Sequence, residues 1–253
     1  MSGESESDDR VIVAIDGPGG VGKSTVARAI ARRLGIPYLE TGAMYRALGL
    51  KALEAGVALD DEAVVERLAI ELDLEMEVLP DGRTVIRLDG EPLGDRIRDE
   101  AVAQAASRVA TLPAVRRRMV EMQRRFGSRS GGVLEGRDIG TKVFPETPYK
   151  FFLDADPEIR LERRLGEHRA RGIEGADLEA LRRELAERDR RDSERADSPL
   201  TKDDSYVVVD TSELGVEQVV ERLDREIARR AGGVSRPTDA CRSTDPSGAS
   251  RDA

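Results

Sequence analysis

Nine residues near the start of the chain have the types and spacing of a loop that binds phosphate. They are Gly17, Pro18, Gly19, Gly20, Val21, Gly22, Lys23, Ser24 and Thr25, and the first eight match G-x-x-x-x-G-K-[ST]. The glycines let successive backbone N–H groups face one anion, and a helix that follows would point its positive end there. Lys23 can reach the terminal phosphates of a nucleotide, and the Ser24 hydroxyl can bind Mg²⁺. The segment therefore predicts a P-loop that binds a nucleoside triphosphate.

The P-loop alone leaves the reaction open. A GTPase would carry an Asn-Lys-x-Asp segment that reads guanine, and the chain has none. A motor or transporter would carry a hydrophobic strand that ends in an acidic residue, and 133–135 is a short candidate. That strand runs directly into Arg137 and Asp138, which suits a second small anionic ligand. Asp16, just before the loop, fits either the surroundings of a metal or a turn at the end of a strand.

Four further groups of polar residues follow predicted strands or flank helix breaks. They are Thr41 with Arg46; Ser107 with Arg116; Arg137 with Asp138; and Arg188, Arg191, Asp192 and Arg195. We expect Thr41 to cap a helix, and the last group to place Arg188, Asp192 and Arg195 on one helix face. A charge-rich helix is more often a solvated surface, and 36 arginines among 41 basic residues also fit composition bias. The combination of all four groups favours arginines that bind phosphate.

Composition excludes several classes of chemistry. The chain has one cysteine, Cys241, and one histidine, His168, so it forms neither an internal disulfide nor a Cys/His zinc site. Aromatic residues make up 3%, tryptophan is absent and the net charge is -9, which argues against nucleic acid as a partner. No apolar run approaches the roughly 18 residues of a membrane span. We therefore expect a cytoplasmic protein without nucleic-acid or membrane partners.

Short apolar runs alternate with longer amphipathic segments between residues 11 and 231. The runs predict strands at 11–15, 37–39, 132–134, 150–153 and 206–209. The segments between them predict helices at 21–34, 42–55, 99–110, 114–126, 157–171, 177–195 and 215–230. Gly35 is the expected stop of the first helix. Strands that are apolar on both faces and alternate with helices indicate a parallel α/β sheet covered on both sides.

One region breaks this alternation, and the two ends of the chain lack it. Residues 72–79 and 84–88 alternate apolar and polar side chains around a Pro-Asp-Gly turn, which predicts an antiparallel hairpin. A third strand at 91–97 would complete a small β insert at about 60–98. The polar ends, 1–10 and 232–253, are expected to be disordered, and 1–10 lack the apolar core of a signal peptide.

Five segments resemble, in order and spacing, the motifs of bacterial cytidylate kinases, a family of P-loop nucleoside monophosphate kinases. Along the chain they read IDGPGGVGKST, LETGAMYRALGLKAL, AQAASRVATLPAVR, LEGRDIGTKVFPETPYKFFLDADPEIRLERR and ERDRRDSERADSPL. The likeness covers about residues 11–231, and the later segments are specific to this family rather than to P-loop proteins at large. The chain departs from the family pattern at Glu40, where Asp is common, and after Gly232.

The resemblance implies an α/β fold and an activity. The fold would be a three-layer P-loop sandwich with a five-stranded parallel sheet, the antiparallel β insert, and a helical lid at about 165–200. The enzyme would be a monomer that transfers the γ-phosphoryl group of ATP to CMP or dCMP, with Mg²⁺. Two alternatives stay open: a P-loop kinase of another small acceptor, such as shikimate or thymidylate, and a regulatory protein that binds nucleotide.

The resemblance also implies roles for individual residues. The P-loop from Gly17 to Thr25 would bind ATP, and its Ser24 would bind the metal. The residues at the CMP phosphate would be Thr41, Arg46 and Arg137. Those at the cytosine would be Ser107, Arg116 and Asp138. Those at the sugar end would be Arg188, Asp192 and Arg195. The catalytic residues would be Lys23, Arg137, Arg188 and Arg191.

Overall fold

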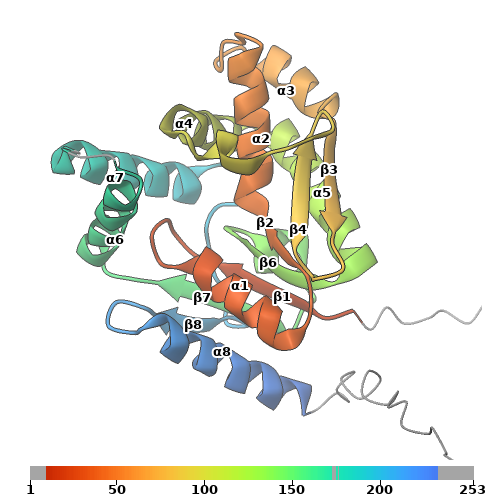
Figure 1. Ribbon diagram of the computed structural model, residues 1–253, viewed down its shortest axis with the longest axis vertical. Helices are drawn as coiled ribbons and strands as arrows, with labels where there is room; N and C mark the ends of the chain where they lie inside the picture. Colours follow the sequence, from red (N-terminus) through yellow and green to blue (C-terminus); the bar gives the residue numbers. More distant parts are fainter. Residues whose placement is uncertain (1–9, 173–174, 176, 233–253) are drawn as a thin grey trace, which may run out of the picture.

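Five strands form one parallel sheet, in the order β2-β6-β1-β7-β8 (Figure 1). The computed structural model describes residues 10–172, 175 and 177–232. The strands of the sheet are β1 (Ile12–Asp16), β2 (Tyr38–Glu40), β6 (Gly132–Gly136), β7 (Tyr149–Asp154) and β8 (Val207–Asp210). Each overlaps a predicted strand, so the predicted five-stranded parallel α/β sheet is confirmed.

Helices cover both faces of this sheet. Two helices, α1 (Lys23–Leu34) and α8 (Val216–Ala231), pack on one face, and α2 (Thr41–Glu54) and α5 (Pro113–Ser130) pack on the other. The central strand shows why, because successive side chains of a strand point to opposite faces. Val13 and Ile15 join the core beneath α1 and α8, whereas Ala14 joins the core beneath α2 and α5. The predicted three-layer sandwich is therefore confirmed.

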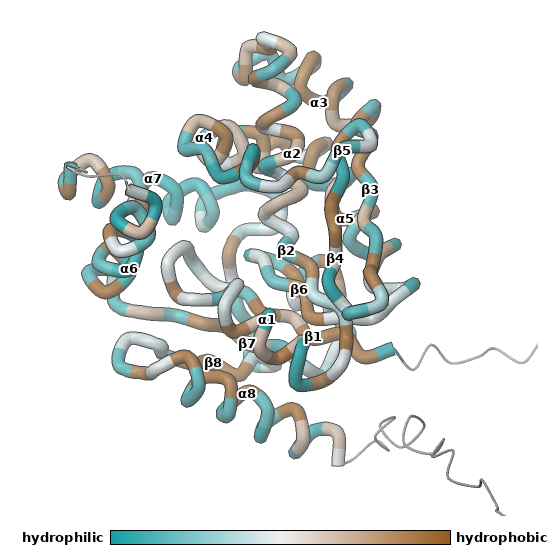
Figure 2. Tube along the Cα trace, viewed as in Figure 1, coloured by the Kyte–Doolittle hydropathy of each residue, from teal (hydrophilic) through white to brown (hydrophobic). Residues whose placement is uncertain are grey.

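Three more helices stand around the carboxyl ends of the strands. They are α4 (Glu100–Val109), α6 (Pro157–Ala170) and α7 (Leu178–Glu194). Figure 2 shows α7 as hydrophilic along most of its length, and only Leu181 and Asp192 of its residues are buried. Because α7 offers so little apolar surface to the core, polar contacts must hold it in place.

The predicted insert contains the expected hairpin and two differences from the prediction. Its elements are α3 (Glu62–Ile70), β3 (Leu74–Val78), β4 (Thr84–Leu88), β5 (Glu91–Pro92) and a 3-10 helix (Gly94–Arg98). The helix α3 was not predicted; Asp61 caps it by accepting a hydrogen bond from the Val64 N–H at 3.2 Å. The predicted strand at 91–97 is wrong beyond Pro92, because the chain leaves the extended conformation at Gly94, which has a φ of 52° and begins the 3-10 helix.

Some predictions fall at the limits of what the structure describes. Residues 1–9 and 233–253, including Cys241, lie outside the described residues. The expected disorder of 1–10 and 232–253 therefore stays a prediction. Within the described ranges, no helix combines the length and the apolar character of a membrane span.

Candidate active site

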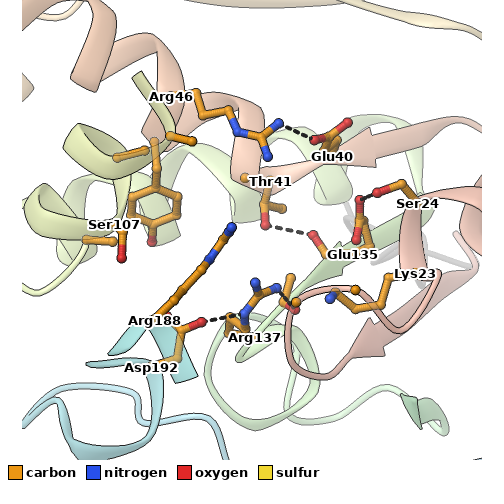
Figure 3. Close-up of a pocket in the computed structure, with 18 of the residues that line it drawn as sticks. Lys23, Ser24, Glu40, Thr41, Arg46, Ser107, Glu135, Arg137, Arg188 and Asp192 are labelled. Atoms are coloured by element: carbon orange, nitrogen blue, oxygen red, sulfur yellow. Dashed lines mark hydrogen bonds and ion pairs between the residues drawn. The ribbon is translucent and has the colours of Figure 1, made fainter. Parts of the chain in front are cut away.

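A cavity lies at the carboxyl end of the sheet, between the P-loop, the start of α2, α4 and α7 (Figure 3). Parallel α/β sheets bind their ligands at this end. Its basic lining residues are Lys23, Arg46, Arg116, Arg137, Arg164, Arg188 and Arg195. Its acidic lining residues are Glu40, Glu135, Asp138, Glu167, Glu184 and Asp192. The predicted site residues absent from this lining are Gly17, Pro18, Val21, Gly22, Thr25 and Arg191.

The P-loop has the backbone that the glycines predicted. Gly17 adopts a φ of 145°, and a Cβ at this position would lie 2.0 Å from the carbonyl oxygen of Leu153 in β7. Only glycine fits so close to the neighbouring strand. Gly22, with a φ of 88°, precedes the first residue of α1, and no side chain caps this helix. The first N–H groups of α1 are therefore available to an anion.

Lys23 is buried beside the loop that precedes it. Its ammonium donates a hydrogen bond to the carbonyl oxygen of Pro18 at 2.6 Å. Burial, together with the positive charge of Arg137, lowers the pKa of Lys23 to about 7. An anion placed against this ammonium would restore its charge, so the position suits a phosphate.

Two hydroxyl groups meet one carboxylate at the side of the P-loop. Ser24 Oγ donates to Glu135 Oε1 at 2.5 Å, and the Tyr38 hydroxyl donates to the same oxygen at 3.0 Å. Hydroxyl and carboxylate oxygens are the ligands that Mg²⁺ prefers in proteins. Ser24 and Glu135 therefore fit a magnesium ion, held directly or through water. The prediction named only Ser24, although the acidic end of 133–135 was a signal for Glu135.

Asp16 has a structural role, which decides between its two predicted alternatives. Its buried carboxylate accepts hydrogen bonds from the N–H groups of Ile139 and Gly140, both at 2.9 Å. The Tyr206 hydroxyl donates a third, at 2.7 Å. Asp16 thereby holds a π-helical turn (Ile139–Val143) that follows Asp138 directly. It positions the loop that carries Arg137 and Asp138.

We expect Asp16 to make the stability of the protein depend on pH. Burial raises the pKa of Asp16 from 3.8 to about 6, despite its hydrogen bonds. Between these values the folded state binds more protons than the unfolded state, so this contribution to the free energy of unfolding falls as pH rises. The loss amounts to about 3 kcal/mol in total, and it is complete above about pH 6. Asparagine does not titrate, so Asp16→Asn should gain stability relative to the wild type over this range.

Urea unfolding of both proteins at pH 4.5, 5.5, 6.5 and 7.5 measures this difference. A gap between wild type and Asp16→Asn that stays constant with pH would contradict the assignment. Asp154→Asn, at the corresponding end of β7, provides a matched control for the loss of one strand-end carboxylate.

The residues predicted to bind the acceptor phosphate are held from several sides. Arg137 donates from Nε to Asp192 Oδ2 at 2.7 Å and from Nη1 to the carbonyl oxygen of Gly136 at 3.1 Å. Thr41 Oγ1 donates to the carbonyl oxygen of Glu135 at 2.7 Å. The prediction that Thr41 caps α2 is therefore wrong, because its hydroxyl bonds across the sheet and Glu40 occupies the N-cap position.

A buried ion pair lines the cavity. Arg116 donates to Asp138, and the two side chains are 1% and 8% exposed. Arg195 approaches Asp138 to 3.8 Å and Asp192 to 3.5 Å. Arg116 Nε and Arg195 Nη2 are buried and make no hydrogen bond to any described residue. Buried donors without partners indicate a ligand that offers acceptors.

Two arginines of α7 differ in what they contact. Arg188 lines the cavity and forms neither a hydrogen bond nor an ion pair with the described residues. Burial, together with the positive charge of Arg137, lowers its pKa to about 10. Arg191 instead donates to Ser107 Oγ at 2.8 Å and to Glu187 Oε1 at 3.0 Å. The structure thus brings Arg188 to the cavity and places Arg191 behind Ser107.

Two arginines of α6 were missing from the predicted site. Arg164 lines the cavity and pairs with Glu100 of α4 at 3.0 Å. Arg160 donates to the carbonyl oxygen of Gly19 at 3.4 Å and to Asp189 of α7 at 2.5 Å. Their spacing of four residues on one helix was a signal that these side chains share a face.

Comparison with known proteins places the chain in a family. The family model described as cytidylate kinase matches residues 13–229. A cytidylate kinase of Geobacillus kaustophilus is 47% identical over 223 residues, which are 88% of this chain and 99% of that protein. One of Rhodococcus opacus is 45% identical over 89% of this chain and 98% of its own. One of Pelotomaculum thermopropionicum is 45% identical over 87% of this chain and 96% of its own. The chain belongs to the cytidylate kinase family.

Proposed function

We propose that the protein transfers the γ-phosphoryl group of ATP to CMP or dCMP, with ADP and CDP or dCDP as products. The observation that carries the proposal is the group of cations between the P-loop and the buried Arg116–Asp138 pair. The charges of Arg137 and Arg188 lower the pKa of Lys23, and Arg188 has no partner among the described residues. Lys23 and Arg188 are thus cations without an ion pair among the described residues, and uncompensated charge of this kind attracts polyanions. Two nucleotides whose phosphates meet here would neutralise it.

The chain's own residues supply binding and orientation. The P-loop amides and Lys23 would hold the donor phosphates, and Arg46 and Arg137 would hold the acceptor phosphate. Arg188 would stabilise the charge of the group in transfer. Positioning and electrostatic stabilisation account for nearly all catalysis of phosphoryl transfer. The reaction therefore needs no cysteine or histidine nucleophile, which agrees with their scarcity in this chain.

Mg²⁺ would be held by Ser24 and, directly or through water, by Glu135. The 2.5 Å contact between their oxygens supports this assignment, because two hard oxygen ligands already lie side by side next to the P-loop. When bound, the ion neutralises charge on the donor phosphates. Tyr38 would keep the Glu135 carboxylate in place when Ser24 turns from that carboxylate to the metal.

We propose the remaining domain roles on the same basis. Residues 165–200 would form a lid over the cavity, since α7 is hydrophilic and contributes Arg188 to the lining. Closure of such a lid excludes water and suppresses hydrolysis of the donor. Residues 60–98 would form the insert on the acceptor side. We also propose that the enzyme acts as a monomer.

A panel of acceptors tests the proposed function. The purified protein, ATP and Mg²⁺ are incubated with CMP, dCMP, UMP, AMP, thymidylate or shikimate, and both ADP and the phosphorylated acceptor are measured. We expect CMP and dCMP to be the fastest acceptors, with one phosphorylated product per ADP. If thymidylate or shikimate is phosphorylated faster than CMP and dCMP, that compound is the acceptor and the proposed one is wrong. Slow release of ADP without any phosphorylated acceptor would favour a regulatory nucleotide-binding protein.

A further inference from the structure

Glu40 lies between two arginines at the end of β2. Its Oε1 accepts a hydrogen bond from Arg46 Nη1 at 3.0 Å, and Figure 3 shows this contact beside the cavity. Its Oε2 accepts one from Arg28 Nη2 of α1 at 3.3 Å. The Glu40 side chain is 24% exposed, so solvent only partly screens these contacts. One carboxylate thus joins an arginine of the cavity to an arginine outside it.

The charges around Arg46 explain why it needs such a partner. Arg46 and Arg137 both act on Arg188 as like charges that lower its pKa. Repulsion of this kind would drive a flexible arginine out of the cavity before an anion is bound. The ion pair with Glu40 opposes the repulsion and uses one N–H of a guanidinium that has five. The other N–H groups of Arg46 remain available to a ligand.

Arg28 in turn holds Glu40. Its guanidinium lies 5.3 Å from the ring centre of Tyr38, so it contacts two residues of β2 that share one face of the strand. Arg28 is one helical turn after Ser24 on α1, the helix that begins at the P-loop. The contacts therefore run from the donor helix α1 through Arg28 and Glu40 to Arg46. Arg28 itself does not line the cavity.

We propose that Glu40 is a positioning residue that holds Arg46 for the acceptor phosphate, and that Arg28 holds Glu40. The inference rests on the proposed function, since the acceptor phosphate is the anion that Arg46 would bind. A bystander carboxylate would have the opposite effect: its negative charge would only repel the acceptor phosphate. Removal of a bystander would lower KM for CMP, whereas removal of a positioning residue raises it.

Steady-state kinetics of four variants, with CMP and ATP varied separately, test the proposal. Glu40→Gln removes the charge and replaces one of the two oxygens with an NH₂ group, which donates instead of accepting, so one of the two arginines loses its acceptor. We expect KM for CMP to rise about 5- to 20-fold, with KM for ATP changed less than about twofold. Arg28→Met should raise KM for CMP about threefold. The matched control, Arg32→Met, removes an equal charge one turn along α1 and should leave KM for CMP unchanged.

The double variant with Arg28→Met and Glu40→Gln tests whether Arg28 affects CMP binding only through Glu40. Its KM for CMP should equal that of Glu40→Gln alone, because Arg28 acts only through Glu40. Three results would each overturn the proposal. The first is a double variant in which the two single increases in KM for CMP multiply. The second is an equal change of KM for CMP in Arg28→Met and Arg32→Met, and the third is a lower KM for CMP in Glu40→Gln than in the wild type. Thermal unfolding of all variants separates a folding defect from a kinetic one. Wild-type turnover of CMP in the same assays tests the proposed function independently.

Discussion

Replacement of Lys23 by alanine is expected to lower kcat for phosphoryl transfer by about 10²- to 10³-fold. This is the usual loss when one preorganised donor is removed from the charge that develops in a transition state. Lys23 donates to Pro18 within its own loop and forms no ion pair with the described residues. The fold should therefore survive the substitution, since burial already disfavours its charged form.

The measurement is kcat with saturating CMP and Mg²⁺-ATP, together with the thermal unfolding curve. Lys51→Ala is the matched control, because Lys51 of α2 pairs with Asp89 of the insert and does not line the cavity. Its turnover should equal that of the wild type. Near-normal turnover of a folded Lys23→Ala variant would show that the P-loop does not act in the proposed reaction.

Replacement of Asp138 by alanine is expected to abolish most cytidine turnover and most discrimination against UMP. Cytosine presents an amino donor at position 4 and an acceptor at N3, whereas uracil presents an acceptor at O4 and a donor at N3. Asp138 only accepts and Arg116 only donates, so with Asp138 at the 4-amino group and Arg116 at N3 the pair matches cytosine and opposes uracil. A buried site that leaves polar groups unpaired rejects the wrong ligand by up to about 10⁴- to 10⁵-fold. The wild type should therefore use UMP poorly.

The buried position of this ion pair calls for a second variant. Removing Asp138 leaves Arg116, which is 1% exposed, without its main partner, and such a loss costs about 3–5 kcal/mol of stability. Asp138→Asn retains the size and an acceptor oxygen, and its amide can also donate to O4 of uracil. We expect Asp138→Asn to fold and to favour CMP over UMP far less than the wild type does. Two results would contradict the assignment of Arg116 and Asp138 to the cytosine. One is an equal kcat/KM for CMP and UMP in the wild type, and the other is a wild-type preference for CMP over UMP in either variant.

Local features of the fold and site followed from the residues alone. Strand β1 could be predicted because continuous apolar residues are typical of a strand buried on both faces. Gly35 ends α1 with a φ of 66°, as the position of a glycine after the last apolar residue indicates. The P-loop could be predicted because its whole motif lies within consecutive residues, and its lysine donates to Pro18 of the same loop. Each of these features depends on neighbours in sequence.

The missed features depend on partners that are distant in the chain or on competition between local rules. Thr41 has the type of a capping residue, yet a carbonyl group of β6, from 94 residues further along the chain, takes its hydroxyl. Arg191 lies on the same charged helix as Arg188, but the guanidinium of Arg191 donates to Ser107 of α4 and does not line the cavity. The helix α3 was not predicted although Asp61 supplies a cap, because the alternating pattern of the hairpin that follows led to the whole region being read as β structure.

The sequence by itself determined which residues have phosphate chemistry, where the strands and helices of the sheet lie, and which family the motifs resemble. The tertiary structure decided which of these residues meet. Ser24 contacts Glu135 across 111 residues, and Arg28 and Arg46 share Glu40, because β2, β6 and β1 lie side by side in the sheet. Apolar periodicity predicts that a strand is buried but not which strand pairs with it. Contacts between strand ends therefore become visible only when the order of the strands is known.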